Sequence, residues 1–346
     1  MKRNQISIFG FYLVAAFTLA LLTMHTSAAF AKVKCVATVP DLADLVRTVG
    51  GDRVEVMSIA KGSQDPHFVD PKPSFMAKLR QADLFLVTGL DLEVGWVPPL
   101  LNGAGNAGIA IGAPGYVDCS AGIPVLELPV GEVTRAEGDV HPFGNPHYML
   151  DPLNGIIVAA HIASVLKQKD PGGAAAFDAN LAGFAQQIYE KLFGKDLVDL
   201  VGGAKLDRMA RSGELDAFLQ SNSGAKLGGW LGLLEPLRGK PIVMYHKNYS
   251  YFVDRFKIEI AGFVEPKPGI PPSAKHMVDV VELIKARNVK IIGTQPFYND
   301  RAPNRIASKT GVKVLVMPST VNQVVGVETY IQLFDFVTSK LAEAEK

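Results

Sequence analysis

Long apolar runs are scarce in this 346-residue chain, and a single run, residues 6–22, is long enough to span a membrane. It follows a start that contains Lys2 and Arg3 but no acidic residue, and it leads into small residues. The triplet Ala-Phe-Ala at 29–31 fits the rule for signal-peptide cleavage, which favours a cleaved signal over an uncleaved anchor. We therefore expect residues 1–31 to be a secretory signal and the remainder to be exported.

Cysteine is also scarce, with only Cys35 and Cys119 in the chain. An oxidising compartment would let the two thiols pair if their Cα atoms lay within about 7 Å. The sequence leaves both a disulfide and two buried thiols open. Lys-Val-Lys precedes Cys35, whereas a lipid-attachment motif needs small and apolar residues there. We therefore expect a soluble exported protein without a lipid anchor.

An excess of charge of either sign is missing. Lys2 and Arg3 leave with the signal, so 33 of the 35 basic residues remain against 34 acidic residues. This balance excludes the electrostatic footprint of a nucleic-acid-binding protein or a protein bound to an anionic membrane. A partner must be recognised by a local site. The exported chain also exceeds the ~250 to 300 residues at which single hydrophobic cores stop growing, which favours two lobes.

Motifs of nucleotide and hydrolytic chemistry are absent or misplaced. Gly103, Gly105 and Gly108 spell G-x-G-x-x-G, but they follow a helix-like segment and precede a short strand, the reverse of the dinucleotide-binding arrangement. These glycines therefore predict a helix exit. The chain has no G-x-S-x-G, Walker or H-E-x-x-H motif. We expect no enzyme activity, and any associated ATPase must be another chain.

Strand and helix patterns alternate along the exported chain, which predicts an α/β fold with parallel sheets. In the first half we expect strands at 34–39, 54–59, 84–88, 109–111 and 125–128, with helices at 41–50, 74–81 and 94–101. In the second half we expect strands at 242–245, 290–293 and 312–317, with helices at 249–256, 275–287, 302–310 and 327–341. Ser273 is the expected N-terminal cap of the helix at 275–287.

Helical spacing also covers residues 153–168 and a longer stretch, 174–200, which we expect to bridge two lobes. The predicted boundaries are an N-terminal α/β lobe at 32–165, a linking helix at 166–205 and a C-terminal α/β lobe at 206–346.

Six histidines lie outside the signal, and four of them occur in loops or at strand ends. These four are His67, His141, His147 and His246. The carboxyl ends of parallel strands are where open α/β sheets bind ligands, so the two lobes could converge on one cleft. The remaining two have structural interpretations: His161 lies among apolar helical residues and is expected in the core, and His276 is expected to be solvated.

Five segments, in this order and spacing, carry a resemblance to a known family: DPHFVDPKPS, LVTGLDLE, GNPHYMLDP, PIVMYHKNYSYF and EPKPGIPPSAKH. The chain resembles the metal-specific solute-binding receptors of bacterial ATP-binding-cassette (ABC) importers, the cluster that handles zinc and manganese. The resemblance implies two βα lobes joined by a long rigid helix, with one metal in the cleft between them. It also implies that His67 and His147 of the first lobe and His246 of the second bind that metal.

Zinc is the expected ion, because neutral imidazole suits Zn²⁺ and manganese sites favour carboxylate oxygen. In manganese members of the family, the position that matches His246 is a glutamate. Cu²⁺ or Ni²⁺ could occupy the same ligands in vitro. A manganese-type receptor remains an alternative.

The fourth ligand departs from the family pattern. Many relatives have an aspartate where Met317 precedes Pro318 here, and a thioether binds zinc poorly. The fourth position is therefore water or a side chain from elsewhere, and His141 is our first candidate. Asp65 is a weaker one, because Pro66 restricts its backbone and a turn role suits it better.

These inferences predict a periplasmic, monomeric zinc receptor that delivers Zn²⁺ to the permease of an ABC importer. Loading by a zinc chaperone is left open. Two alternatives use the same features: an adhesin of the same fold, and a zinc hydrolase with an open fourth position, which the missing H-E-x-x-H motif disfavours.

Overall fold

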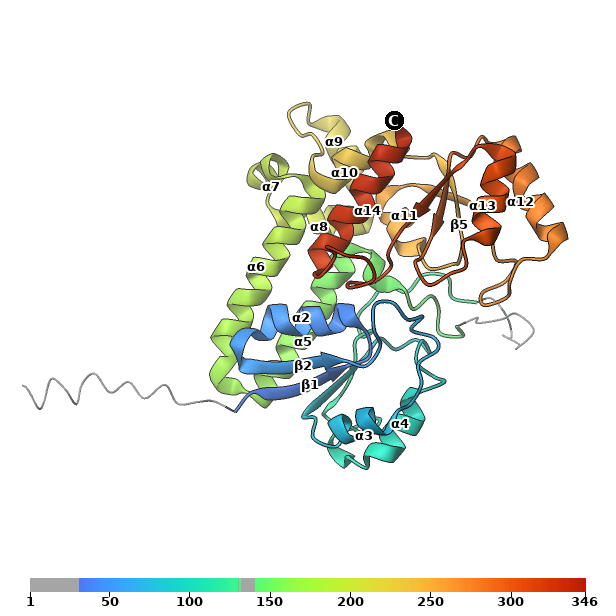
Figure 1. The fold of residues 1–346 in the computed structure, drawn as a ribbon. Coiled ribbons are helices and arrows are strands. Elements are labelled where there is room, and N and C mark those ends of the chain that lie inside the picture. Colours follow the sequence, from blue (N-terminus) through green and yellow to red (C-terminus); the bar gives the residue numbers. More distant parts are fainter. Residues whose placement is uncertain (1–30, 130, 132–140) are drawn as a thin grey trace, which may run out of the picture. The chain divides into compact units, whose positions relative to one another are not determined.

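The computed structural model describes residues 31–129, 131 and 141–346, and residues 33–346 form one unit, to which the following refers. This unit contains two four-stranded, all-parallel sheets, with strand orders β2-β1-β3-β4 and β6-β5-β7-β8. Helices flank both sheets (Figure 1). The predicted fold class, two parallel βα lobes joined by a long helix, is confirmed.

The first lobe alternates strands and helices up to residue 118. Its elements are β1 (Val33–Ala37), α2 (Pro40–Gly50), β2 (Val54–Ser58), α3 (Pro73–Leu79), β3 (Leu84–Val87), α4 (Val97–Ala104) and β4 (Tyr116–Asp118). Helix α4 ends at Gly105 in a left-handed conformation (φ 63°), so the glycine-rich segment is the predicted helix exit.

Two predicted strands of this lobe are wrong. Ile109 is the last residue of a 3₁₀ turn in which the Asn106 side chain accepts a hydrogen bond from the Gly108 N–H, and residues 110–111 form a bend and a turn without strand pairing. Residues 125–128 form no strand, and Glu127 has φ 57°, a left-handed conformation that a strand does not allow. The fourth strand is instead β4, which pairs with β3.

Helices fill the middle of the chain. They are α5 (Pro152–Lys169), α6 (Ala174–Phe193), α7 (Lys195–Val201), α8 (Gly203–Ser212), α9 (Leu215–Ser221) and α10 (Gly229–Leu234). The helix expected over 174–200 is broken at Gly194, which has φ 89° and approaches Gly228 too closely for any side chain. Helix α6 packs against α2 and α10 and so connects the two sheet regions (Figure 1).

The second lobe repeats the alternation. Its elements are β5 (Pro241–Met244), α11 (Ser250–Phe256), β6 (Glu259–Phe263), α12 (Ala274–Arg287), β7 (Ile291–Thr294), α13 (Arg301–Thr310), β8 (Lys313–Val316) and α14 (Tyr330–Glu345). Strand β6 was not predicted, because it is a half-buried edge strand without a clear apolar alternation. Ser273 caps α12 as predicted, by accepting the His276 N–H.

One hydrophobic core extends through both lobes and includes Leu42, Phe177, Phe252 and Phe334. Polar contacts across the lobes reinforce it. Asp41 of α2 accepts the backbone N–H of Val321 (3.0 Å) and the hydroxyl of Thr320. Because these contacts join the start of α2 to the segment after β8, they limit relative movement of the lobes.

Both cysteines are buried free thiols. Cys35 lies in β1 and Cys119 directly follows β4, with β3 between these two strands. Two strand spacings of about 4.8 Å already exceed the ~7 Å that a disulfide allows. The structure therefore favours the second of the two alternatives, two buried thiols.

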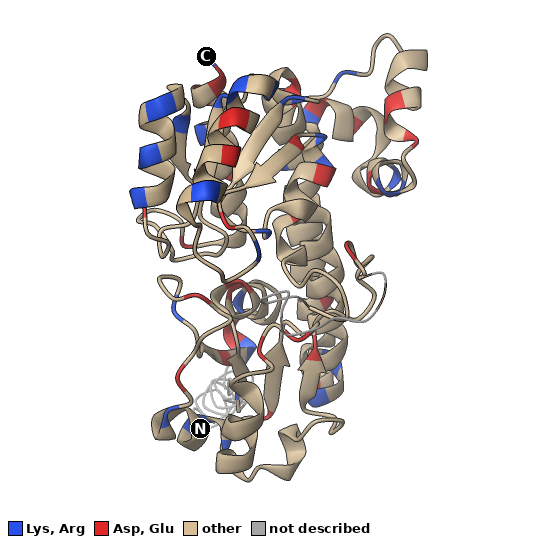
Figure 2. Cartoon of the chain, turned by 90° about the vertical axis from the view of Figure 1, so that its right-hand side faces the viewer, with Lys and Arg blue, Asp and Glu red and all other residues tan. Residues whose placement is uncertain are grey.

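The charged surface agrees with the balanced composition, since basic and acidic residues are interspersed over both lobes (Figure 2). Within residues 31–129, 131 and 141–346, no helix has the length and apolarity needed to cross a membrane. The predicted signal peptide falls almost entirely on residues 1–30, outside the described part of the chain.

Candidate metal centre

His67 lies in the loop between β2 and α3, where Asp65 fixes both its backbone and its ring. One Asp65 oxygen, Oδ1, accepts the His67 N–H (3.0 Å) and lies 2.7 Å from His67 Nδ1. Burial raises the pKa of Asp65, but the hydrogen bond and charge of His67 outweigh it and bring this pKa below its usual value. Asp65 thus has the expected turn role and also orients the imidazole, so that His67 Nε2 faces His141.

His141 and His147 come from one tight segment ahead of α5. Gly144 has φ 96° and donates its N–H to the His141 carbonyl (3.1 Å), which turns the chain back on itself. Asn145 Oδ1 accepts the His147 N–H (2.9 Å), and Asn145 Nδ2 donates to the Lys247 carbonyl (3.0 Å). The segment is therefore fixed against the second lobe.

The two imidazoles of this segment resist protonation. Burial, followed by the neighbouring His67 and His246, lowers the pKa of His141 to about 3. The same causes, with His141 added, hold the pKa of the partly buried His147 well below its usual value. Both rings are therefore neutral near pH 7 and have a free electron pair for a cation.

His246 follows β5 and is the contribution of the second lobe. Its Nδ1 lies 2.8 Å from Glu265 Oε2, and both side chains are buried. The Glu265 N–H donates to the Tyr245 carbonyl (3.1 Å), and Gly269 N–H donates to Glu265 Oε2 (3.3 Å). This arrangement fixes the ring and leaves His246 Nε2 free.

The four histidine rings lie together. The ring centroids of His141, His147 and His246 are 5.3, 5.3 and 5.7 Å from that of His67. His67 Nε2 is 3.2 Å from His141 Nε2, and the ligating nitrogens of His67, His141 and His147 all lie within 4.8 Å of one another. His246 is outside this tight group of three, although its centroid is also 5.7 Å from that of His147.

These separations approach those of a tetrahedral zinc site. Zn–N bonds of about 2.0 to 2.1 Å place ligand nitrogens about 3.3 Å apart, close to the His67–His141 distance. A set of four would require His246, which lies outside the tight group, to move inward. The arrangement can therefore hold one small cation through three or four imidazoles.

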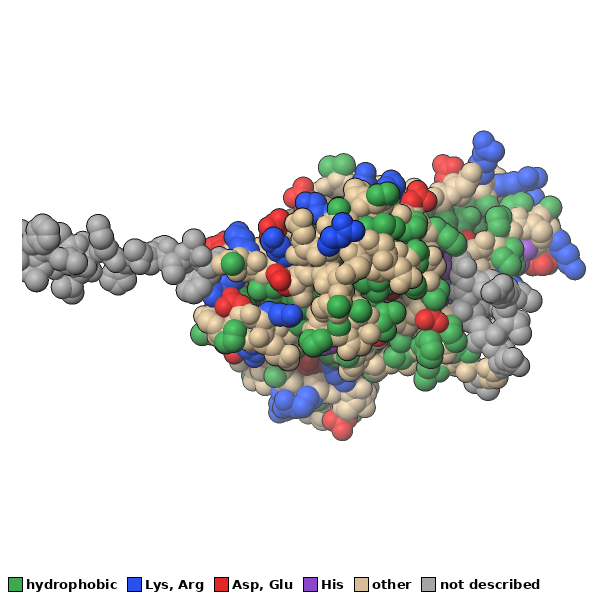
Figure 3. Space-filling view, turned by 90° about the horizontal axis from the view of Figure 1, so that it is seen from below, with side chains coloured by type: hydrophobic (Ala, Val, Ile, Leu, Met, Phe, Trp, Pro, Cys, Tyr) green, Lys and Arg blue, Asp and Glu red, His purple; other side chains and the backbone are tan. Residues whose placement is uncertain are grey.

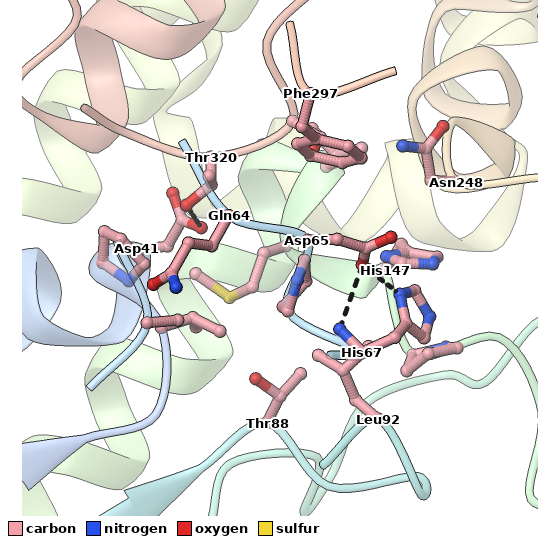
Figure 4. Close-up of a pocket in the computed structure, with 18 of the residues that line it drawn as sticks. Asp41, Gln64, Asp65, His67, Thr88, Leu92, His147, Asn248, Phe297 and Thr320 are labelled. Atoms are coloured by element: carbon pink, nitrogen blue, oxygen red, sulfur yellow. Dashed lines mark hydrogen bonds and ion pairs between the residues drawn. The ribbon is translucent and has the colours of Figure 1, made fainter. Parts of the chain in front are cut away.

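A cavity of about 50 Å³ adjoins the cluster and is lined by His67, His147 and His246. Figure 4 shows His67 and His147 beside Asp65, with Thr88 on one side of the cavity and Asn248 and Phe297 on the other. Thr88 Oγ1 and Asn248 Oδ1 are buried without a hydrogen-bond partner among the described residues. The cavity thus has room and polar groups for an ion with one or more waters.

The other candidate residues lie elsewhere. Met317 is fully buried in the core and does not line this cavity. His161, expected in the core, is half-buried on α5. The prediction of a solvated His276 is wrong, because its ring is half-buried and Nε2 lies 3.1 Å from the Phe263 carbonyl.

Sequence reasoning missed Glu265, Asn145 and Asn248. Glu265 follows β6, and recognising that strand would have placed a carboxylate at the same sheet edge as His246.

Comparison with known proteins identifies the family. A family model described as ZnuA, the periplasmic component A of a zinc-uptake complex, matches residues 35–191 and 233–344. The chain belongs to this family. Membership confirms the resemblance inferred from the motifs and the prediction that the chain is not an enzyme, because the family consists of uptake-system binding components.

Curated relatives of the family are similar to this chain to different extents. The metal ABC transporter substrate-binding lipoprotein FimA of Streptococcus parasanguinis is 31% identical over 292 residues, covering 84% of this chain and 80% of FimA. The manganese ABC transporter substrate-binding lipoprotein PsaA of Streptococcus pneumoniae is 34% identical over 160 residues, covering 45% of this chain and 48% of PsaA. The chain thus spans about half the length of PsaA in that match.

A crystal structure of ZnuA superimposes with a TM-score of 0.67 at 20% sequence identity, covering 91% of this chain and all of the other. At this identity the likeness concerns the fold alone. It extends over both lobes of the family fold.

Proposed function

We propose that this chain is an exported receptor that captures Zn²⁺ and delivers it to the permease of an ABC importer. The observation that carries the proposal is the convergence of His67, His141, His147 and His246 from separate segments of both lobes. Four imidazoles are a donor set that suits zinc.

In this proposal His67 and His246 bind through Nε2, because a carboxylate engages Nδ1 of each ring. His147 supplies the third nitrogen. His141 fills the fourth position, and its short distance to His67 supports this assignment. Met317 is buried in the core and does not compete for that position. Asp65 and Glu265 orient the rings and offset the charge of the dication from outside the ligand set.

Zinc is proposed over manganese because the tight group contains histidines alone among the described residues, whereas manganese sites favour carboxylate oxygen. The name of the family model refers to zinc uptake, whereas the name of PsaA refers to manganese. The names of similar proteins therefore support either ion. The histidine ligands of this chain favour zinc.

The proposed location is the periplasm, after removal of a signal peptide at residues 1–31. FimA and PsaA are named lipoproteins. Here Cys35 is buried within β1 and burial raises its pKa to about 12, which is unsuited to an accessible lipid-attachment site. N-terminal sequencing of the secreted protein tests this point: a free N-terminus at Lys32 is expected, and an acylated Cys35 would contradict it.

The test of function is metal content and affinity of the exported protein, purified without a histidine tag. Elemental mass spectrometry is expected to find about one zinc per chain, and titration against a chelator is expected to give a higher affinity for Zn²⁺ than for Mn²⁺. His161→Ala is the matched control, because this histidine lies outside the cluster. A protein that takes up no metal, or that prefers Mn²⁺, would overturn the proposal.

A further inference from the structure

The first lobe contains a groove of about 450 Å³ that is separate from the histidine cavity. It lies at the carboxyl ends of β3 and β4, the edge at which α/β sheets bind partners. Three apolar side chains on its lining are strongly exposed: Val94 (64%), Ile111 (69%) and Phe143 (59%). Figure 3 shows apolar side chains on the face seen from below, where this lobe lies. A clustered exposed apolar surface of this kind marks an interaction site.

The charge of the groove is of one sign. Asp91, Glu93 and Asp118 contribute to its lining, and no Lys or Arg does so within the described chain. Glu93 is buried and accepts hydrogen bonds from the Thr88 and Gly89 N–H groups. The carboxylate of Asp91 has no hydrogen bond or ion pair within the described residues. Asp118 is exposed, and its carboxylate accepts hydrogen bonds from Ser120 alone among those residues. Two carboxylates are therefore available to a cationic partner.

The loop that carries Asp91 is held in an unusual conformation. Gly89, Leu90 and Asp91 are consecutive left-handed residues with φ of 80°, 51° and 64°. Such a conformation costs on the order of 1 kcal/mol or more for a residue such as Leu90. The Glu93 carboxylate stabilises the loop through the two N–H groups that it accepts. The fold thus places Asp91 at the groove before any partner arrives.

The groove shares a wall with the candidate metal centre. Phe143 lies between His141 and His147 in sequence, within the turn closed by the Gly144 N–H and the His141 carbonyl. A partner that contacts Phe143 would therefore touch the segment that supplies two of the four histidines. A partner bound in the groove could therefore change the positions of the histidines at the metal centre.

We propose that this groove docks a segment of the importer permease that presents a Lys or Arg side chain beside an apolar one. The apolar side chain would pack against Val94 and Ile111, and the cation would pair with Asp91 and Asp118. This inference rests on the proposed function, because it takes the permease as the partner. The uniform negative charge around an apolar floor is the complementarity that selects this occupant.

The experiment measures binding of the metal-loaded protein to the permease–ATPase complex of the same organism, reconstituted in nanodiscs. Asp91→Asn removes the charge and keeps a residue that tolerates the left-handed conformation. Ile111→Glu places a charge on the apolar floor. Leu200→Glu changes an equally exposed apolar residue on α7 and is the control. Each groove variant is expected to bind about tenfold more weakly or worse, and the control within about twofold of wild type.

Zinc titration of the same samples separates this proposal from the proposed function. If the wild type binds zinc and the permease, and the groove variants bind the permease equally well, the groove assignment is overturned and the receptor function stands. A wild type that binds no zinc overturns the receptor function itself. Light scattering measures whether the wild type forms a dimer through the groove. A wild-type dimer that Ile111→Glu converts to monomers would assign the groove to a second copy of the chain and overturn the proposal.

Discussion

The two lobes share one architecture but contribute differently to the candidate metal centre. The first supplies three histidines from two loops, whereas the second supplies His246 alone, from the end of a buried strand. The carboxylate partners also differ, since Asp65 belongs to a partly exposed turn and Glu265 is buried. The comparison teaches that the same βα repeat can offer ligands from hydrogen-bonded loops on one side and a ligand from a strand end on the other.

Removing a histidine from each side gives the largest expected effect. His67→Ala is expected to reduce zinc affinity by about a thousandfold, because a ligand of the tight group is lost; His246→Ala is expected to have a smaller effect, since its ring lies outside that group. Chelator competition measures both affinities. His276→Ala is the control. A larger loss for His246→Ala would reverse the proposed ranking of the lobes.

The ion pair between Arg255 of α11 and Asp151, the cap of α5, provides a test of how the second lobe is fastened to the first. Arg255 Nη2 lies 2.8 Å from Asp151 Oδ2, and the two side chains are only 10% and 8% exposed. Arg255→Met leaves a buried carboxylate unpaired and is expected to lower the free energy of unfolding by about 3 to 5 kcal/mol.

Its matched control is Arg287→Met, which breaks a half-exposed pair with Glu259 within the second lobe. This change is expected to cost less than about 1 kcal/mol. Urea denaturation of the metal-free proteins measures both values. An equal decrease in the free energy of unfolding of the two variants would mean that the ion pair across the lobes stabilises the protein no more than an exposed pair does.

The carboxylates that contact His67 and His246 provide a further comparison of the lobes, with smaller expected effects. Glu265→Gln and Asp65→Asn keep the size of each side chain but remove its charge, and each is expected to reduce zinc affinity by about 10- to 100-fold. The larger reduction is expected for Glu265, because it is the more buried of the two. Calorimetric zinc titration checks this order, with circular dichroism as the control for folding. Unchanged affinity in both variants would argue against a role for these carboxylates.

The pH dependence of stability tests the Asp41 contact between the lobes. Burial raises the pKa of Asp41 to about 7, against the hydrogen bonds from Thr320 and Val321, which lower it. The folded state therefore holds a proton that the unfolded chain releases above about pH 4. The stabilisation that comes from this proton is fully present below about pH 4. As the pH rises from 4 toward 7, the free energy of unfolding falls by about 1.4 kcal/mol per pH unit.

Asp41→Asn is expected to remove this slope, because the amide does not ionise: its oxygen can accept the Val321 N–H and its NH2 group can donate to the Thr320 hydroxyl oxygen. Urea denaturation of wild type and variant from pH 4 to pH 8 checks the difference. Parallel pH profiles would show that Asp41 titrates normally in the folded protein.

Prediction from sequence succeeded where local pattern and structure coincide. Segments with clear periodicity, such as α12 with its Ser273 cap, were placed within a residue or two. It failed where backbone conformation or packing decides: Glu127 adopts a left-handed conformation that no apolar pattern signals, and β6 is a half-buried edge strand. At the candidate site, the histidines were identified from motifs, but Glu265 was missed together with its strand.

The sequence by itself determined the parallel α/β fold, because strand and helix periods alternate, and it identified the four histidines, because each stands in a loop or at a strand end. Only the tertiary structure decided which residues meet. The 3.2 Å approach of His67 to His141, the pairing of His246 with Glu265 and the acidic groove beside Phe143 depend on packing between segments distant in sequence. Such packing is set by the whole core, and no local pattern encodes it.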